Sequence, residues 1–252
     1  MSTEQTEAIV LRMVEFSETS LIVTLYGRDL GRVSAIAKGA RRPKGPFEGA
    51  LDLLSICRVV VITKSTDVLD LLTEAKLQRR FRAGERSLVR LHCGYYVAEL
   101  LRVWTDSGSG SRPLYDLAVR TIEAIDGGGD ALLATLRFEL AGLRILGHGM
   151  ATSGCVSCGG SAESGESRVP FAYHLGGVLC QACRLRQRDV ASVRREVLGL
   201  CEQFQETERP IEGGLSAPDY RDLRGVVSRY VMTQLGMPLR TQSMLPTGWV
   251  TH

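Results

Sequence analysis

Two pairs of cysteines, each with two residues between its members, place the tightest constraint on how this chain can fold. Cys155 pairs with Cys158 and Cys180 with Cys183, and a glycine-rich segment separates the pairs. Four thiolates delivered from two tight turns suit a tetrahedral metal, and zinc is the usual one. With sulfur in all four positions the site is closed. We therefore expect one structural Zn²⁺, because a catalytic zinc keeps a position open for water.

Two disulfides are the alternative interpretation of the four cysteines. A disulfide within one pair is geometrically poor, but a bond from one pair to the other is possible. Residues 1–7 are polar and acidic and carry no secretory signal, which favours a reducing cytoplasmic compartment and a metal. His148 and His174 flank or lie within this segment, and either could replace a cysteine as a ligand.

The composition sets few limits on function. A net charge of +3, with 44% hydrophobic and 23% charged residues, is ordinary for a globular protein of 252 residues. The mildly basic balance permits nucleic-acid binding without requiring it. No apolar run approaches the roughly 20 residues of a membrane span, so we expect no membrane association.

The N-terminal third of the chain has the pattern of β-structure. Short runs rich in valine, isoleucine and leucine alternate with turn signals such as Gly27 and Gly31. The predicted strands cover residues 8–16, 20–26, 32–38, 51–62 and 68–76. Five short strands in this length fit an OB-type barrel, although the composition of the last run is also compatible with a helix.

Beyond residue 81 the apolar spacing becomes helical. Helices are predicted at residues 87–103, 113–126, 130–146, 189–206 and 218–235, with a hairpin at 168–179 that turns at Gly176 and Gly177. The expected architecture is an α+β multidomain protein. An OB-fold barrel at residues 1–80 precedes a helical domain at residues 81–252, and a four-cysteine zinc module at about residues 151–186 is inserted into that domain.

A basic loop lies between the third and fourth predicted strands. No acid interrupts the sequence from Gly31 to Glu48, and glycines and prolines let the backbone approach a polyanion. Cations suited to phosphate contacts are Arg28, Arg32, Lys38, Arg41, Arg42 and Lys44. On a barrel this loop would border the face that OB-folds use for single strands. Phe47 beside it, or Tyr26 and Phe16 in strands nearby, could stack on a base, although such rings more often pack in the core or fill a strand. The alternative is a solvated loop that only keeps the barrel soluble.

The chain carries no recognisable catalytic motif. The four histidines have no paired spacing, and neither H-E-x-x-H nor G-x-S-x-G occurs. The basic loop also departs from a phosphate-binding loop, because Pro46 stands where a hydroxyl residue is needed. We therefore expect a binding protein and no enzyme. The alternatives are a zinc-dependent DNA-processing enzyme and a zinc-ribbon scaffold that binds only proteins.

These motifs together resemble the RecO family of bacterial DNA repair and recombination mediators. The resemblance rests on Ala-Ile-Val-Leu at residues 8–11, Ser-Glu-Thr-Ser-Leu at 17–21 and Lys-Gly-Ala-Arg at 38–41. It continues through Arg-Phe-Glu-Leu at 137–140, both cysteine pairs and Leu235 with Gly236. It therefore covers nearly the whole chain.

The resemblance implies a DNA-binding protein that anneals complementary strands and works with RecR to load RecA onto DNA coated by single-strand-binding protein (SSB). It implies binding to single- and double-stranded DNA, contacts from Lys38, Arg41, Arg42 and Lys44, and zinc at the four cysteines. Arg137 becomes a candidate for holding the acidic C-terminal tail of SSB. The expected location is the cytoplasm, in association with the nucleoid. Pro43 and Pro46 depart from the family pattern, and they stiffen the loop.

Overall fold

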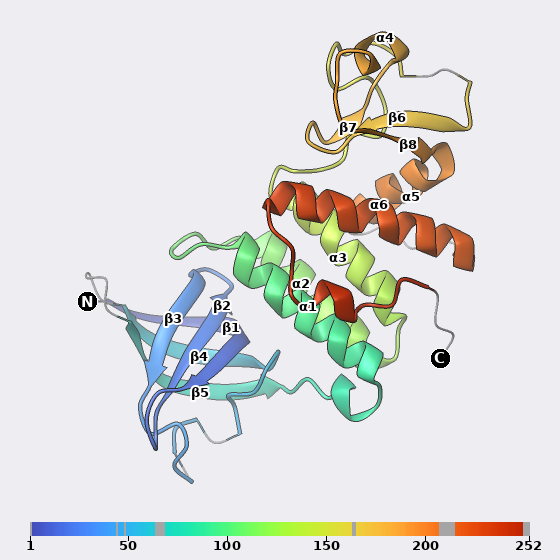
Figure 1. Cartoon of the computed structure of the whole chain (residues 1–252). Helices are drawn as coiled ribbons and strands as arrows, with labels where there is room; N and C mark the ends of the chain where they lie inside the picture. Colours follow the sequence, from blue (N-terminus) through green and yellow to red (C-terminus); the bar gives the residue numbers. More distant parts are fainter. Residues whose placement is uncertain are drawn as a thin grey trace. The chain divides into compact units, whose positions relative to one another are not determined.

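The computed structural model describes residues 2–43, 45–47, 49–63, 69–162, 165–206 and 215–248 (Figure 1). The chain divides into two compact units, Met1–Ala131 and Leu132–His252. The first contains all five strands of the barrel and two helices, and the second contains the remaining helices and the cysteine cluster. No helix in the described ranges combines the length and apolar character that crossing a membrane requires.

The strands of the first unit form a closed barrel. They are β1 (Ser2–Glu15), β2 (Leu21–Gly27), β3 (Gly31–Ala37), β4 (Ile56–Thr63) and β5 (Asp70–Arg79). Their order around the barrel is β1-β2-β3-β5-β4, with β3 and β5 parallel and the other pairs antiparallel. This five-stranded closure confirms the predicted OB-type barrel, including the strand character of the fifth run.

Strand β1 is long because it serves both sides of the barrel. Its first half pairs with β4, from Ser2 opposite Thr63 to Ile9 opposite Ile56. Its second half pairs with β2, and the register shifts between Val10 and Arg12. The prediction started this strand at residue 8, six residues too late, because the polar residues before it gain their order from pairing with a distant strand.

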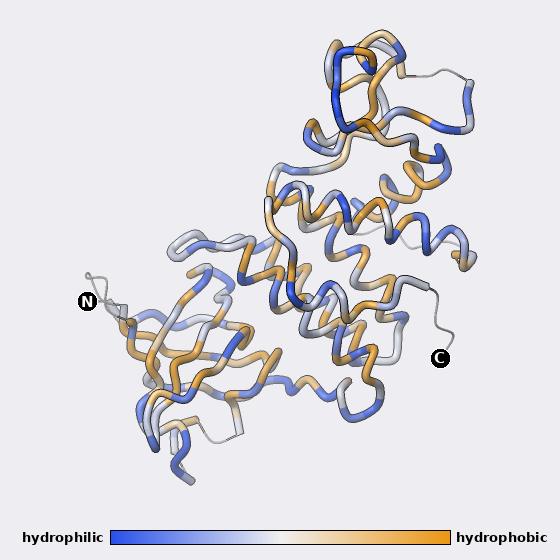
Figure 2. Tube along the Cα trace, in the orientation of Figure 1, coloured by the Kyte–Doolittle hydropathy of each residue, from blue (hydrophilic) through white to orange (hydrophobic). Residues whose placement is uncertain are grey.

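Alternating side chains of the strands fill the barrel, and Figure 2 shows the hydrophobic residues along them. The core includes Val10, Leu25, Ala35, Val59 and Leu72, all at most 1% exposed. The predicted strand at residues 51–62 starts only at Ile56. The preceding residues form a turn, because Asp52 accepts a hydrogen bond from the Leu53 amide and buried Leu54 adopts a left-handed conformation.

Two helices complete the first unit: α1 (Leu88–Trp104) and α2 (Arg112–Gly127), preceded by the short 3₁₀ helix η1 (Ala83–Glu85). The Tyr26 hydroxyl donates to the Ser111 carbonyl at 3.2 Å, and its ring lies 6.2 Å from that of Tyr115. A Cβ at Gly110 would come within 2.4 Å of the Asp29 carbonyl oxygen. The loop before α2 therefore touches the β2–β3 turn directly, and only glycine permits that approach.

The second unit contains three longer helices and a small sheet. The elements are α3 (Ala131–Ile145), β6 (Arg168–Ala172), β7 (Gly177–Val178), α4 (Gln181–Arg184), β8 (Val190–Arg194), α5 (Arg195–Gln205), α6 (Ala217–Leu235) and η2 (Gln242–Met244). The sheet has the order β7-β6-β8. The hairpin predicted at residues 168–179 is confirmed by the antiparallel pairing of β6 with β7.

The helix predicted to begin at residue 189 begins at Arg195 instead, because the preceding residues form β8. Asp189 has a positive φ of 56°, which breaks any helical run. Val190 to Arg194 then pair with the free edge of β6. The residues of this segment are locally compatible with either a helix or a strand. Pairing with β6, which is remote in sequence, makes the segment a strand.

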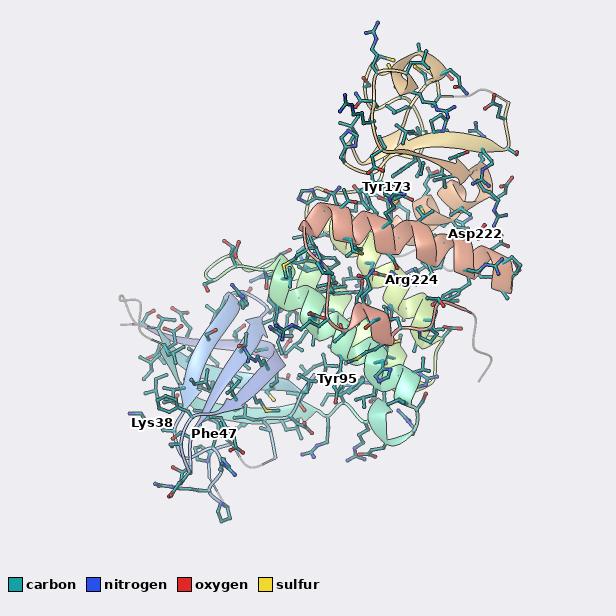
Figure 3. All side chains as sticks on the ribbon, in the orientation of Figure 1. Lys38, Phe47, Tyr95, Tyr173, Asp222 and Arg224 are labelled. Carbon is teal, nitrogen blue, oxygen red and sulfur yellow. The ribbon has the colours of Figure 1, made fainter. Side chains whose placement is uncertain are left out.

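A buried ion pair joins α3 to α6. Arg224 (labelled in Figure 3) and Glu139 are both buried, at 4% and 0% exposure. Arg224 Nη1 donates to Glu139 Oε2 at 2.6 Å, its Nη2 donates to Oε1, and its Nε donates to the Ser228 hydroxyl at 3.0 Å. The bidentate geometry and the third hydrogen bond offset the cost of burying two charges.

Candidate metal centre and nucleic-acid interface

The first cysteine pair occupies a tight turn that glycines make possible. Gly154 and Gly159 have positive φ values of 72° and 73°. The Cys155 amide donates to the Gly160 carbonyl at 2.8 Å, and the Gly159 amide donates to the Cys155 carbonyl at 2.8 Å. These bonds direct both thiols to the same side of the turn.

The second cysteine pair lies at the start of the short helix α4. Cys180 precedes α4, and its carbonyl accepts from the Arg184 amide at 3.0 Å. The Val156 amide donates to the Val178 carbonyl at 3.0 Å, so a backbone hydrogen bond joins the segments that carry the two cysteine pairs. A Cβ at Gly177 would come within 2.3 Å of the Val156 side chain, which explains the need for glycine there.

The four sulfur atoms lie within 4.8 Å of one another, and Cys158 Sγ is 3.9 Å from Cys180 Sγ. A tetrahedron with metal–sulfur bonds of about 2.3 Å has sulfur atoms about 3.8 Å apart. The thiols are free, and a disulfide would require a separation near 2 Å. The arrangement therefore fits a four-sulfur metal site and contradicts the disulfide alternative.

Two of the thiols have opposite pKa shifts. Burial raises the pKa of Cys155, but hydrogen bonds from the backbone amides of Cys180, Ser157 and Cys158 outweigh it and bring the pKa to about 6. A hydrogen bond from Ser157 lowers the pKa of Cys183, yet its bonds with Cys180 and Cys158 raise it to about 11. Neighbouring thiols cannot all ionise without a compensating cation, as expected of a ligand set that releases protons when metal binds.

The histidines do not join this cluster. Among the described residues, the four cysteines are the one group of three or more histidine, cysteine, aspartate or glutamate side chains close enough to share a metal. His174 Nε2 lies 3.3 Å from the Gln187 side-chain oxygen, and the His148 carbonyl accepts from the Tyr230 hydroxyl at 2.9 Å. The proposed replacement of a cysteine by histidine has no support in this geometry.

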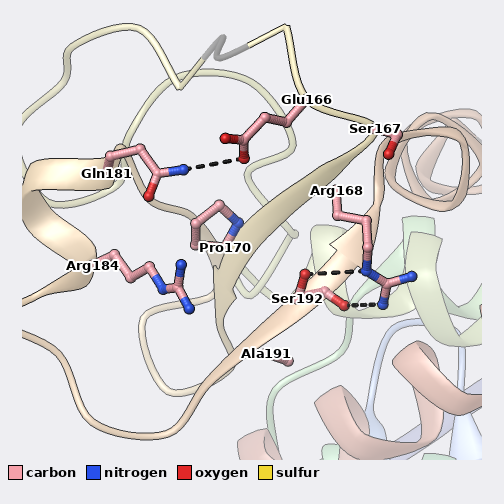
Figure 4. Close-up of a pocket in the computed structure, with 8 residues that line it drawn as sticks. All are labelled: Glu166, Ser167, Arg168, Pro170, Gln181, Arg184, Ala191 and Ser192. Carbon is pink, nitrogen blue, oxygen red and sulfur yellow. Dashed lines mark hydrogen bonds between the residues drawn. The ribbon is translucent and has the colours of Figure 1, made fainter.

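A pocket of about 290 Å³ lies between α4 and strands β6 and β8 (Figure 4). Gln181 of α4 donates to the Glu166 carboxylate at 3.2 Å, and Arg168 Nε donates to the Ser192 hydroxyl at 3.1 Å. The first contact ties α4 to the segment that leads into β6. It therefore helps to hold the second cysteine pair in place.

The basic loop leaves the barrel at the end of β3. Lys38, Arg41 and Arg42 are exposed (Lys38 is labelled in Figure 3), whereas Lys44 lies outside the described residues. Gly39 has a positive φ of 75°, and its carbonyl accepts from the Arg42 amide at 3.0 Å. The loop is thus a hydrogen-bonded turn that presents cations to solvent, a form suited to phosphate contacts.

Arg28 and Arg32 lie at the opposite end of β3 from this loop. Lys38 follows Arg32 by six positions, which is about 20 Å along an extended strand. Arg28 pairs with Asp116 at 3.3 Å, while Arg32 lies 3.8 Å from Asp106 and donates to the Arg102 carbonyl at 3.1 Å. The structure therefore does not bring these two arginines together with the loop.

The barrel differs from the expectation in two other ways. Phe47 is 3% exposed and belongs to the barrel core, so it cannot stack on a base as suggested. Arg12, which sequence reasoning missed, is exposed on β1 opposite Thr24 of β2. Side chains along β1 alternate between the core and solvent, which could have revealed that Arg12 is exposed. The register shift between Val10 and Arg12 changes this alternation, and the shift is not visible in the sequence.

Arg137 of α3 is half-buried against α5. Its guanidinium lies 5.8 Å from the centre of the Phe204 ring, a cation–π distance. Burial lowers its pKa. Leu140, at helical spacing from Arg137, is buried, and so is the adjacent Leu136. The side chain thus combines charge with apolar surroundings, which suits a carboxylate ligand beside a hydrophobic residue.

Two family models match this chain. The model described as "Recombination protein O N terminal" matches residues 1–81, and "Recombination protein O C terminal" matches residues 85–243. The DNA repair protein RecO of Rhodopirellula baltica is 45% identical over 263 aligned positions, which cover 95% of this chain and 97% of the relative. The DNA repair proteins RecO of Anaeromyxobacter sp. (strain K) and Symbiobacterium thermophilum are 30% and 32% identical, over 94% and 73% of this chain. These alignments cover 93% and 72% of the two relatives.

Proposed function

The chain belongs to the RecO family of DNA repair proteins, and we propose that it is a DNA-binding recombination mediator. In this proposal it binds single- and double-stranded DNA, anneals complementary strands and, together with RecR, helps to load RecA onto single strands coated by SSB. It acts in the cytoplasm, at the nucleoid. Residues 1–80 form the DNA-binding domain, and residues 81–252 form the helical domain with the zinc module at about 151–186.

The observation that carries the proposal is the exposed turn of cations at the end of β3. Lys38, Arg41 and Arg42 project from a closed five-stranded barrel. Cations that neutralise phosphates release counterions, which drives binding without regard to sequence. Two neutralised strands repel each other less, so complementary strands can pair without ATP. Arg28 and Arg32 add positive charge elsewhere on the barrel and are not part of this turn, because they lie at the opposite end of β3.

The cysteine cluster holds one structural Zn²⁺ in this proposal. Cys155, Cys158, Cys180 and Cys183 would supply all four ligands, and the metal would fix the two turns against the small sheet. Since all four positions are taken by sulfur, no substrate or water would reach the metal.

The double substitution Arg41→Glu/Arg42→Glu is expected to weaken binding to all DNA sequences alike. Removal of two phosphate contacts should also flatten the dependence of log K on log salt by about two units. Anisotropy titrations of a labelled oligonucleotide at several salt concentrations measure both quantities. The control is Arg58→Glu/Arg120→Glu, which changes the net charge equally at exposed positions elsewhere in the first unit. Equal affinities and slopes for the folded double variant and wild type would refute the assignment.

The acidic tail of SSB is expected to bind at Arg137. A peptide that ends in a hydrophobic residue and a free carboxylate needs a fork of donors beside apolar surface, and Arg137 on Phe204 offers both. Arg137→Ala should weaken binding of a labelled tail peptide by about 1.5 kcal/mol or more. Arg144→Ala is the matched control, since Arg144 lies on the same helix but is exposed and paired with Glu206. Unchanged peptide affinity in folded Arg137→Ala would place the site elsewhere.

A further inference from the structure

The turn between β1 and β2 presents an aromatic ring to solvent. Phe16 is 59% exposed. In the described part of the chain, every other phenylalanine, tyrosine or tryptophan is buried or half-buried. Placing a large apolar ring in water forgoes roughly 1.5–3 kcal/mol of burial free energy. An exposed ring of this kind is what base stacking requires.

The backbone of the turn holds Phe16 in place. The Phe16 amide donates to the Ser20 carbonyl at 3.0 Å, and the Ser17 amide donates to the same oxygen at 3.3 Å. Glu15 of β1 and Leu21 of β2 are the last paired residues of the two strands, and the turn lies between them. Phe16 therefore directly follows a paired strand, which favours a preorganised contact over a flexible one.

The same turn is bonded to the basic loop. The Arg41 amide donates to the Thr19 carbonyl at 3.1 Å, and the Arg41 guanidinium lies 3.2 Å from the Glu15 carboxylate. Both contacts involve residues of the segment that contains Phe16. The ring and the loop cations therefore belong to one continuous surface of the barrel.

Charge divides this surface into two parts. Glu15 and Glu18 flank Phe16 in the sequence and are exposed, so the turn itself disfavours phosphate. Lys38, Arg41 and Arg42 lie on the loop beside it and favour phosphate. A strand whose backbone follows the loop would thus turn its bases toward Phe16. In a duplex the bases stack on one another and offer no such face.

We propose that Phe16 is a stacking platform for the bases of single-stranded DNA, and that it makes the barrel distinguish single strands from duplex. The inference rests on the proposed function, since it needs the loop cations to hold the phosphates. Arg41 has a second role in this inference, because its amide and its guanidinium hold the turn that carries the Phe16 ring.

The test compares three labelled ligands of equal length: a single strand, the same strand with abasic sites, and the duplex. Phe16→Ala should weaken binding to the single strand by roughly 5- to 150-fold, the value of one to three kcal/mol of stacking. Affinity for the abasic strand and the duplex should stay within twofold of wild type. The salt slope should not change, because no phosphate contact is lost. Phe16→Trp should restore the affinity for the single strand.

Leu77→Ala is the control for removal of an exposed apolar side chain, since Leu77 is 39% exposed on β5. Equal single-strand affinity for Phe16→Ala and wild type would overturn the inference, as would equal losses on all three ligands. A Lys38→Glu/Arg42→Glu variant separates the two proposals, because it reverses loop cations and keeps the Arg41 contacts that hold the Phe16 turn. If it loses binding and Phe16→Ala does not, only the stacking role fails. If it binds as wild type does, the basic loop is not the DNA site.

Discussion

Replacing Arg224 by methionine is expected to destabilise the second unit by about 3–5 kcal/mol, the usual cost of breaking a buried ion pair from one side. The substitution leaves the Glu139 carboxylate fully buried without the fork that pairs both its oxygens. Urea denaturation of the full chain, followed by circular dichroism, measures the loss. Hydrogen exchange in α3 and α6 assigns it to this unit.

Two variants separate the charge effect from loss of side-chain volume. Arg221→Met alters an exposed arginine on the same helix, with a side chain 69% exposed, and should change stability by less than about 0.5 kcal/mol. Glu139→Leu/Arg224→Met removes both charges and should recover most of the loss. If the double variant were as unstable as Arg224→Met, packing rather than charge would explain the effect.

Replacing Cys158 by serine is expected to abolish stoichiometric metal binding. Structural zinc contributes on the order of 10–16 kcal/mol to folding of small modules, so loss of one ligand in four should remove several kcal/mol from this region. Cys158 is exposed, so its substitution removes little packing, whereas Cys155 is buried. Elemental analysis of protein purified without chelator measures zinc, and limited proteolysis reports local unfolding between α3 and α5.

The affinity of the Cys158→Ser variant for DNA should stay close to that of wild type, because the basic loop belongs to the other unit. Cys201→Ala is the matched control: Cys201 is buried outside the cluster and should keep one metal per chain. Wild-type protein with no bound metal, or full metal content in Cys158→Ser, would contradict a four-cysteine site.

Local patterns in the sequence were enough to predict the main architecture. Apolar runs between glycine turns predicted five strands, and helical spacing predicted α1, α2, α3 and α6 closely. The cysteine pairs predicted a cluster because the pattern encodes its own geometry: each pair fixes a turn, and the glycines permit it. In each case the information lies within a few residues of the feature.

Features that depend on remote partners were missed or misplaced. β8 was assigned to a helix because its partners in β6 lie 18 to 26 positions away in sequence. Arg28 and Arg32 were grouped with the basic loop because they are near it in sequence, but they lie at the other end of β3. Phe47 was named as a candidate for base stacking because it follows the basic loop in sequence, but closure of the barrel buries it.

The shared role of β1 has a consequence for the nascent chain. Its second half finds β2 within a few residues, but its first half must wait for β4, more than forty residues later. At a synthesis rate of about 5–20 residues per second, that is a delay of several seconds. An unpaired edge of this length invites aggregation, and charged side chains such as Glu4 and Glu7 guard against it. The polarity that hid this segment from sequence reasoning thus protects it on the ribosome.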